Sequence, residues 1–127
     1  MVSVTFPYPP TAGGTQVRTY NLMRHLQRHH NVTVVTHVDK KVPPEDIEEL
    51  RQQVDTLKVF RRPSLTESGA AGLNKWVNFV VNGTPPSVQS HHSPAMQTWI
   101  DEQVLAGKFD AVTCEHSANE QYLRPEW

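Results

Sequence analysis

The chain has 127 residues, a formal net charge of -1 at pH 7, one cysteine and 37% hydrophobic residues. This length suits one domain with a buried core, and the near-zero charge gives no overall attraction to nucleic acid. A single cysteine excludes an internal disulfide, which favours a reducing compartment. No stretch approaches the roughly 20 apolar residues of a membrane span. Because Pro7 ends the first apolar run and no basic residues precede it, we expect no signal peptide and a cytoplasmic protein.

The first predicted strand covers residues 2–6, where β-branched and aromatic residues dominate. Prolines and the pair Gly13-Gly14 follow, and they indicate a rigid approach to a permissive turn. Residues 15–28 can then form about four helical turns, with Thr11 or Thr15 as the N-cap. A strand, a glycine turn and a helix in this order present backbone N–H groups to an anion.

The middle of the chain continues to alternate strands with helices. Residues 32–36 are almost continuously apolar, which indicates a parallel strand that is buried on both faces. Two prolines and two acidic residues at positions 43–46 mark the start of a helix. A third strand is predicted over residues 56–60.

The last half of the chain is predicted to hold three helices and a fourth strand. The predicted segments are a loop at 63–72, helices at 73–81, 93–105 and 118–123, and a strand at 109–114. Pro94 suits the first turn of its helix, and Gly107 suits the position just beyond the end.

This alternation predicts an α/β fold, a Rossmann-like parallel sheet of order 3-2-1-4 with helices on both faces. Parallel sheets bind ligands at the carboxyl ends of their strands. In this order the first and fourth strands are neighbours. The Gly13-Gly14 turn and the Glu115-His116 pair after the fourth strand should therefore open into one crevice.

Two parts of the chain resemble a known family. The stretch from Phe6 to Leu26, with its motif Pro-Tyr-Pro-Pro-Thr-Ala-Gly-Gly-Thr, and the stretch at 30–36 resemble the opening of GT-B glycosyltransferases. More narrowly, they are similar to bacterial family-four retaining enzymes, which build polysaccharides and lipid-linked sugars. Residues 109–123 resemble the continuation past the fourth strand of the N-terminal domain. The resemblance follows the whole chain in order, with its strong motifs in residues 1–36 and 109–127.

The resemblance implies an enzyme with two Rossmann-like domains, of which residues 1–127 are the N-terminal, acceptor-side one. The C-terminal domain, which holds the nucleotide-sugar, lies beyond the match, so the isolated piece should be inactive. The full-length enzyme would transfer a sugar to a glycan or lipid-linked acceptor with retention. It would use the nucleotide-sugar as substrate and need no cofactor. The resemblance also allows peripheral contact with the inner face of the membrane.

By the same resemblance, Gly13 and Gly14 lie against the donor diphosphate when the two domains close. The chemistry agrees, because residues without a Cβ let backbone N–H groups approach phosphate oxygens at a helix start. Arg18 follows one turn later and suits an anion, and Thr15 is a weaker candidate. The alternatives are a turn without a ligand and a solvated arginine. The G-x-G-x-x-G spacing of dinucleotide sites is missing.

Glu115 and His116 are the candidate catalytic residues, since the family places a polar residue there that faces the acceptor or the reacting sugar. Either side chain could orient an acceptor hydroxyl or accept its proton. In the family the leaving phosphate is commonly argued to be the base, so we expect a positioning role. Which of the two aligns with the family stays open, as does the alternative of a solvent-exposed cap at the strand end.

No metal is expected. His25 and His29 have the i,i+4 spacing that can bind zinc on a helix. However, no glutamate lies between them as in H-E-x-x-H, and the neighbouring arginines repel a cation. Cys114 is predicted to be a buried thiol and not a nucleophile.

Two other functions fit the same pattern. A stand-alone flavodoxin-like α/β binding or regulatory module would need about five strands, more than the four predicted here. Half of a sugar-phosphate epimerase on a GT-B-like scaffold is the other alternative.

Overall fold

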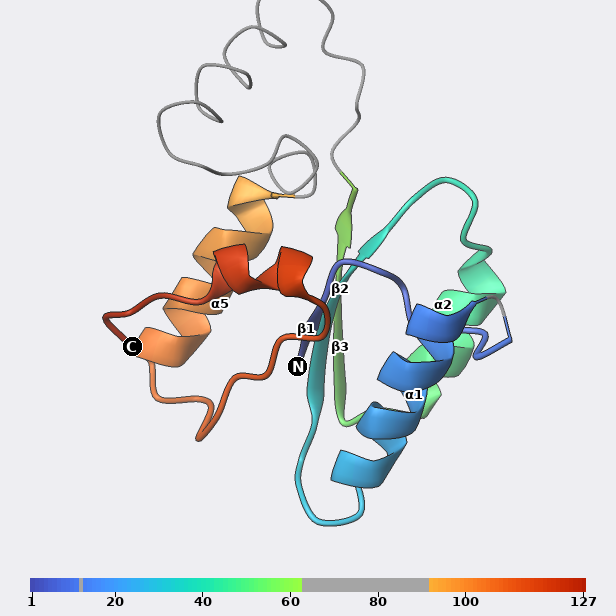
Figure 1. Ribbon diagram of the computed structural model, residues 1–127, viewed down its shortest axis with the longest axis horizontal. Coiled ribbons are helices and arrows are strands. Elements are labelled where there is room, and N and C mark those ends of the chain that lie inside the picture. The colour runs from blue at the N-terminus through green and yellow to red at the C-terminus, as the bar shows by residue number, and fades with distance from the viewer. Residues whose placement is uncertain (12, 63–91) are drawn as a thin grey trace, which may run out of the picture.

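The computed structural model describes residues 1–11, 13–62 and 92–127, which form a parallel sheet with helices on both sides (Figure 1). The elements are β1 (Val2–Ser3), α1 (Gly14–Leu26), β2 (Thr33–Val38), α2 (Pro44–Gln52), β3 (Thr56–Arg61), α5 (Pro94–Leu105) and the 3₁₀ helix η1 (Ser117–Tyr122). Helices α1 and α2 lie on one side of the sheet, and α5 lies on the other (Figure 1). The predicted loop at 63–72 and the apolar helix at 73–81 lie outside the described residues.

The sheet has the order β1-β2-β3, and both pairs of neighbouring strands are parallel. Val35 of β2 lies opposite Val2 of β1 and opposite Lys58 of β3. Four consecutive β2 residues, Val34 to His37, are buried. The predicted parallel α/β sheet and its doubly buried central strand are therefore confirmed.

The core has two parts, one on each face of the sheet. Val34 and Val35 are adjacent in β2 and belong to different parts, because successive side chains of a strand point to opposite faces. The part beneath α5 contains Val2, Val4, Val35, Met96, Ile100 and Tyr122. The part beneath α1 and α2 contains Phe6, Met23, Val32, Val34, Leu50 and Leu57.

The helix ends follow local chemistry in two cases. Pro44 is in the first turn of α2, with Glu45 and Asp46 beside it, as predicted. At α5 the Ser93 hydroxyl accepts a hydrogen bond from the Met96 N–H at 3.3 Å.

Helix α1 begins differently from the prediction. Its N-cap is Gly13, and no side chain caps it. Thr15 lies inside the first turn and Thr11 precedes the cap, so the predicted threonine cap is wrong. The helix starts one residue earlier than expected, and its first-turn N–H groups stay without a side-chain cap.

The predicted strand over residues 109–114 is also wrong. In the structure this segment forms an isolated parallel bridge, between Cys114 and Val2, in place of a strand. Its two hydrogen bonds run from the Val2 N–H to the Thr113 carbonyl, at 2.7 Å, and from the Glu115 N–H to the Val2 carbonyl, at 3.0 Å. The segment nevertheless lies on the side of β1 away from β2, next to the strand that was predicted to pair with it.

The reason is the short length of β1, which ends at Ser3 and not at Phe6 as predicted. The next N–H that could continue the ladder belongs to Val4, and it donates to the Asn119 side-chain oxygen at 2.9 Å. A side chain has thus replaced backbone pairing at this point. Helix η1, which carries Asn119, lies beside β1 as a result (Figure 1).

Candidate functional site

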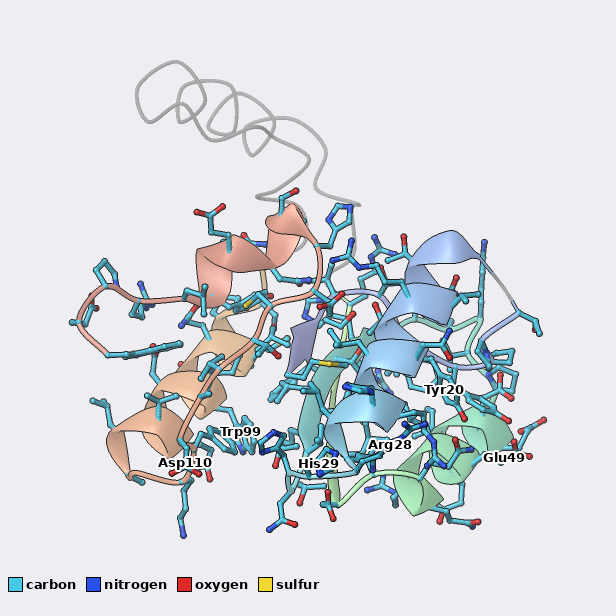
Figure 2. All side chains as sticks on the ribbon, turned by 60° about the horizontal axis from the view of Figure 1, so that its bottom comes forward. Tyr20, Arg28, His29, Glu49, Trp99 and Asp110 are labelled. Atoms are coloured by element: carbon cyan, nitrogen blue, oxygen red, sulfur yellow. The ribbon has the colours of Figure 1, made fainter. Side chains whose placement is uncertain are left out.

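The proline-rich corner after β1 is anchored on α2. The Tyr8 hydroxyl donates a hydrogen bond to the Glu49 carboxylate, and this hydrogen bond raises the pKa of Tyr8. The Tyr8 ring centroid lies 6.1 Å from that of Tyr20 in α1. Figure 2 shows Tyr20 and Glu49 coming from these two helices on the same side of the molecule. Tyr8 therefore fixes the approach to the Gly13-Gly14 turn.

Neither glycine of the turn is required by the packing around it. Gly13 has an extended backbone (φ 170°), which any residue can adopt. Among the described residues, a Cβ on Gly13 would meet only the flexible end of the Gln16 side chain, at 2.8 Å, and a Cβ on Gly14 would meet no atom within 4 Å. The start of α1 is thus open, and a ligand can approach its first-turn N–H groups, including that of the exposed Thr15.

The structure brings two predicted site residues together from distant parts of the chain. The Arg18 Nε lies 3.4 Å from a Glu115 carboxylate oxygen. The Arg18 side chain is 77% exposed, whereas that of Glu115 is 9% exposed. Glu115 follows the bridge to β1, and Arg18 lies one turn into α1. Their contact connects the two parts of the predicted site, the start of α1 and the Glu115-His116 pair.

His116 has a different position from its neighbour. It is exposed, and its Nδ1 accepts a hydrogen bond from the Ala118 N–H at 3.3 Å, so it caps η1. Its backbone has φ 80° and ψ 139°, a region that costs a non-glycine residue about 1–3 kcal/mol. Of the two candidate catalytic residues, Glu115 contacts α1 and His116 holds the bend that presents it.

Asn119 is a site residue that the sequence prediction missed. Its side chain is fully buried, and it accepts a hydrogen bond from the Val4 N–H and donates one to the Glu115 carbonyl. The backbone N–H of Asn119 donates a hydrogen bond to the His116 carbonyl at 3.0 Å. Asn119 thereby ties the Glu115-His116 bend to β1. The available signal was its position four residues after Glu115 in a predicted helix.

The structure also contains a cavity of about 520 Å³ near the amino ends of β1 and β2, at the opposite end of these strands from the candidate site. It is lined by the start of β1, by the turn between α1 and β2, and by residues 108–113. His29 and Asp110, two of its lining residues, lie at the same edge of the molecule in Figure 2. None of the predicted site residues lines this cavity, so it is separate from the candidate site.

A metal site does not emerge from the described residues. Within residues 1–11, 13–62 and 92–127, no three His, Cys, Asp or Glu side chains are placed to share an ion. The helices of the same residues include none that is long and apolar enough to cross a membrane.

Cys114 is partly buried in the bridge, and burial raises the pKa of its thiol from 9.0 to about 11. We expect iodoacetamide to alkylate it, at about pH 8, roughly tenfold more slowly than the unfolded chain. The hundredfold smaller thiolate fraction is partly offset by the higher nucleophilicity of a more basic thiolate. Equal rates with and without urea, followed by mass spectrometry, would contradict this burial.

The same pKa shift affects stability at alkaline pH. The pKa of the Cys114 thiol is higher in the folded state than in the unfolded state. Its contribution to the free energy of unfolding is therefore fully present below pH 9 and is lost as the pH rises toward 11.

Comparisons of the chain with protein-family models, curated proteins and solved structures return no match.

Proposed function

We propose that this chain is the acceptor-side, N-terminal domain of a retaining GT-B glycosyltransferase. The observation that carries the proposal is the meeting of Arg18 with Glu115 beside the open start of α1. It places a guanidinium that can bind phosphate next to a carboxylate that can bind hydroxyl groups. In this proposal the segment before Glu115 takes the fourth position of the 3-2-1-4 sheet.

The anion would bind at the start of α1. The N–H groups of Gly14 and Thr15 and the positive end of the helix dipole suit the diphosphate of a nucleotide-sugar. Arg18 adds a cation one turn further along the same helix. The second domain of the enzyme would deliver the donor to this place.

Glu115 and His116 would serve the acceptor, a glycan or a lipid-linked sugar. In the transfer, the bond from the anomeric carbon to the diphosphate oxygen breaks, and a bond to the acceptor oxygen forms. The acceptor proton passes to the leaving diphosphate, so the side chains orient the hydroxyl without having to keep its proton. A lipid-linked acceptor would bring the domain to the inner face of the membrane.

Inorganic pyrophosphate tests the anion site directly. We expect it to shift the amide NMR signals of Gly13, Gly14 and Thr15. Arg18→Gln should weaken the binding of pyrophosphate at least about tenfold, because a hydrogen bond between charged groups is lost. Arg24→Gln is the matched control, since it removes the same charge from the last turn of α1.

A second variant tests the open space at the glycine turn. Gly14→Ala should fold normally, since its Cβ meets no atom of the described residues within 4 Å, and should weaken pyrophosphate binding because the methyl group occupies the approach. Its melting temperature provides the folding control. Unchanged Gly13 and Gly14 signals at millimolar pyrophosphate in the wild-type protein would refute the proposed function.

A further inference from the structure

We infer that Glu115 is a displaceable partner of Arg18: a diphosphate arriving at α1 takes the guanidinium, and the released carboxylate then receives the acceptor hydroxyl. The inference rests on the proposed function and adds a rule about the order of binding. It follows from three properties of the Arg18–Glu115 pair.

The first property is that the contact is weak. The 3.4 Å separation of Arg18 Nε from the Glu115 oxygen exceeds the roughly 2.7–2.9 Å of a charge-assisted hydrogen bond. Because the Arg18 guanidinium is exposed, water screens its attraction to the carboxylate, so that this attraction by itself shifts an equilibrium by roughly two- to fivefold. A ligand with more than one negative charge can therefore displace the carboxylate, whereas a monoanion gains little over it.

The second property is that Arg18 can move more freely than Glu115. Arg18 extends from the exposed face of α1, so its long side chain can turn toward a ligand while the helix stays in place. The backbone of Glu115 is held by Val2 on one side and by Asn119 on the other. Opening the pair therefore moves Arg18 and leaves Glu115 where it is.

The third property is the burial of Glu115. With its side chain only 9% exposed, the carboxylate has lost most of its water, and losing Arg18 would take away the cation that pairs with it in the described part of the chain. A nearly buried charge without a partner is costly, and a hydroxyl donor relieves that cost. Binding of the anion should thus favour binding of an acceptor hydroxyl, and by linkage the reverse also holds.

The pair also lowers the affinity for any anion. An incoming anion must compete with a carboxylate that is already in place, and pyrophosphate competes better than acetate because it carries more negative charge. Replacing Glu115 with a neutral residue of the same shape removes this competitor. The variant should then bind both anions more tightly, and by a similar factor, because the same competitor has been removed for each of them.

The experiment measures pyrophosphate binding by calorimetry for the wild type, Glu115→Gln and Glu120→Gln. Glu120→Gln removes the same charge from an exposed side chain of η1 and is the matched control. We expect Glu115→Gln to bind pyrophosphate at least about two- to fivefold more tightly than Glu120→Gln, because it removes the competing attraction and the cost of leaving a nearly buried carboxylate without its cation. In the Arg18→Gln background this gain should vanish, which a double-mutant cycle measures.

Nitrogen NMR of the Arg18 side chain can follow, in the unmodified protein, the replacement of Glu115 by pyrophosphate as the partner of the guanidinium. We expect the Nε signal to shift as pyrophosphate is added. Equal affinities of Glu115→Gln and Glu120→Gln, or weaker binding by Glu115→Gln, would overturn the inference while the proposed anion site stands. Absence of pyrophosphate binding in every variant would overturn both.

Discussion

Leu50→Ala is expected to lower the free energy of unfolding by about 2–5 kcal/mol, whereas Leu105→Ala should change it by less than about 0.5 kcal/mol. Leu50 is fully buried in α2, in the core part that also contains Met23 and Leu57. Removing it loses transfer free energy and leaves a cavity. Leu105 ends α5 and is 78% exposed, so it is a control with the same chemical change.

Urea denaturation followed by circular dichroism measures both variants. The midpoint of Leu50→Ala should fall strongly, and that of Leu105→Ala should stay close to wild type. Similar losses for the two leucines would contradict the packing of α2 on the sheet.

The second large effect is expected at Asn119. Asn119→Ala should lower the free energy of unfolding by about 2–6 kcal/mol, because the buried Val4 N–H and Glu115 carbonyl each lose a partner, at about 1–3 kcal/mol each. Asn21→Ala, at an exposed position of α1, is the control and should have little effect.

Asn119→Asp separates the two hydrogen bonds. The introduced carboxyl keeps an acceptor for the Val4 N–H, but when ionised it faces the Glu115 carbonyl with an oxygen instead of an N–H donor. Burial should raise the pKa of this carboxyl above its unfolded value of about 4. The stability of the variant is then closest to that of the wild type below about pH 4, where the carboxyl is protonated, and it falls as the pH rises.

Denaturation at acidic and neutral pH, each compared with wild type, measures this difference. A loss that does not depend on pH would show that the second hydrogen bond does not hold the bend. Because the bend carries Glu115, Asn119→Ala should also weaken the Arg18–Glu115 coupling in a double-mutant cycle.

Several elements could be predicted because their signals lie within a few neighbouring residues. Pro44 and the acidic residues after it start α2, and Ser93 and Pro94 start α5. The near-continuous apolar run of β2 indicated a central parallel strand, and the structure buries it on both faces. The general location of the candidate site followed from the same reasoning, because strand order decides which chain segments lie side by side.

The remaining features depend on contacts between distant residues. The apolar pattern of residues 109–114 is typical of a strand, yet pairing requires an equally long neighbour, and β1 ends at Ser3. The Asn119 side chain then takes the Val4 N–H, across 115 positions of sequence. No local pattern contains this competition for one backbone group.

The sequence by itself determined the α/β class, the parallel sheet, the order of the helices that the structure describes, and a glycine turn leading into a basic helix, because periodicity and turn chemistry are local. Only the tertiary structure decided that Gly13 begins α1 without a side-chain cap, that a buried amide holds the bend after the bridge, and that Glu115 contacts Arg18. The last two join residues that lie far apart in the sequence, Asn119 with Val4 and Glu115 with Arg18, and no local pattern contains such a pairing.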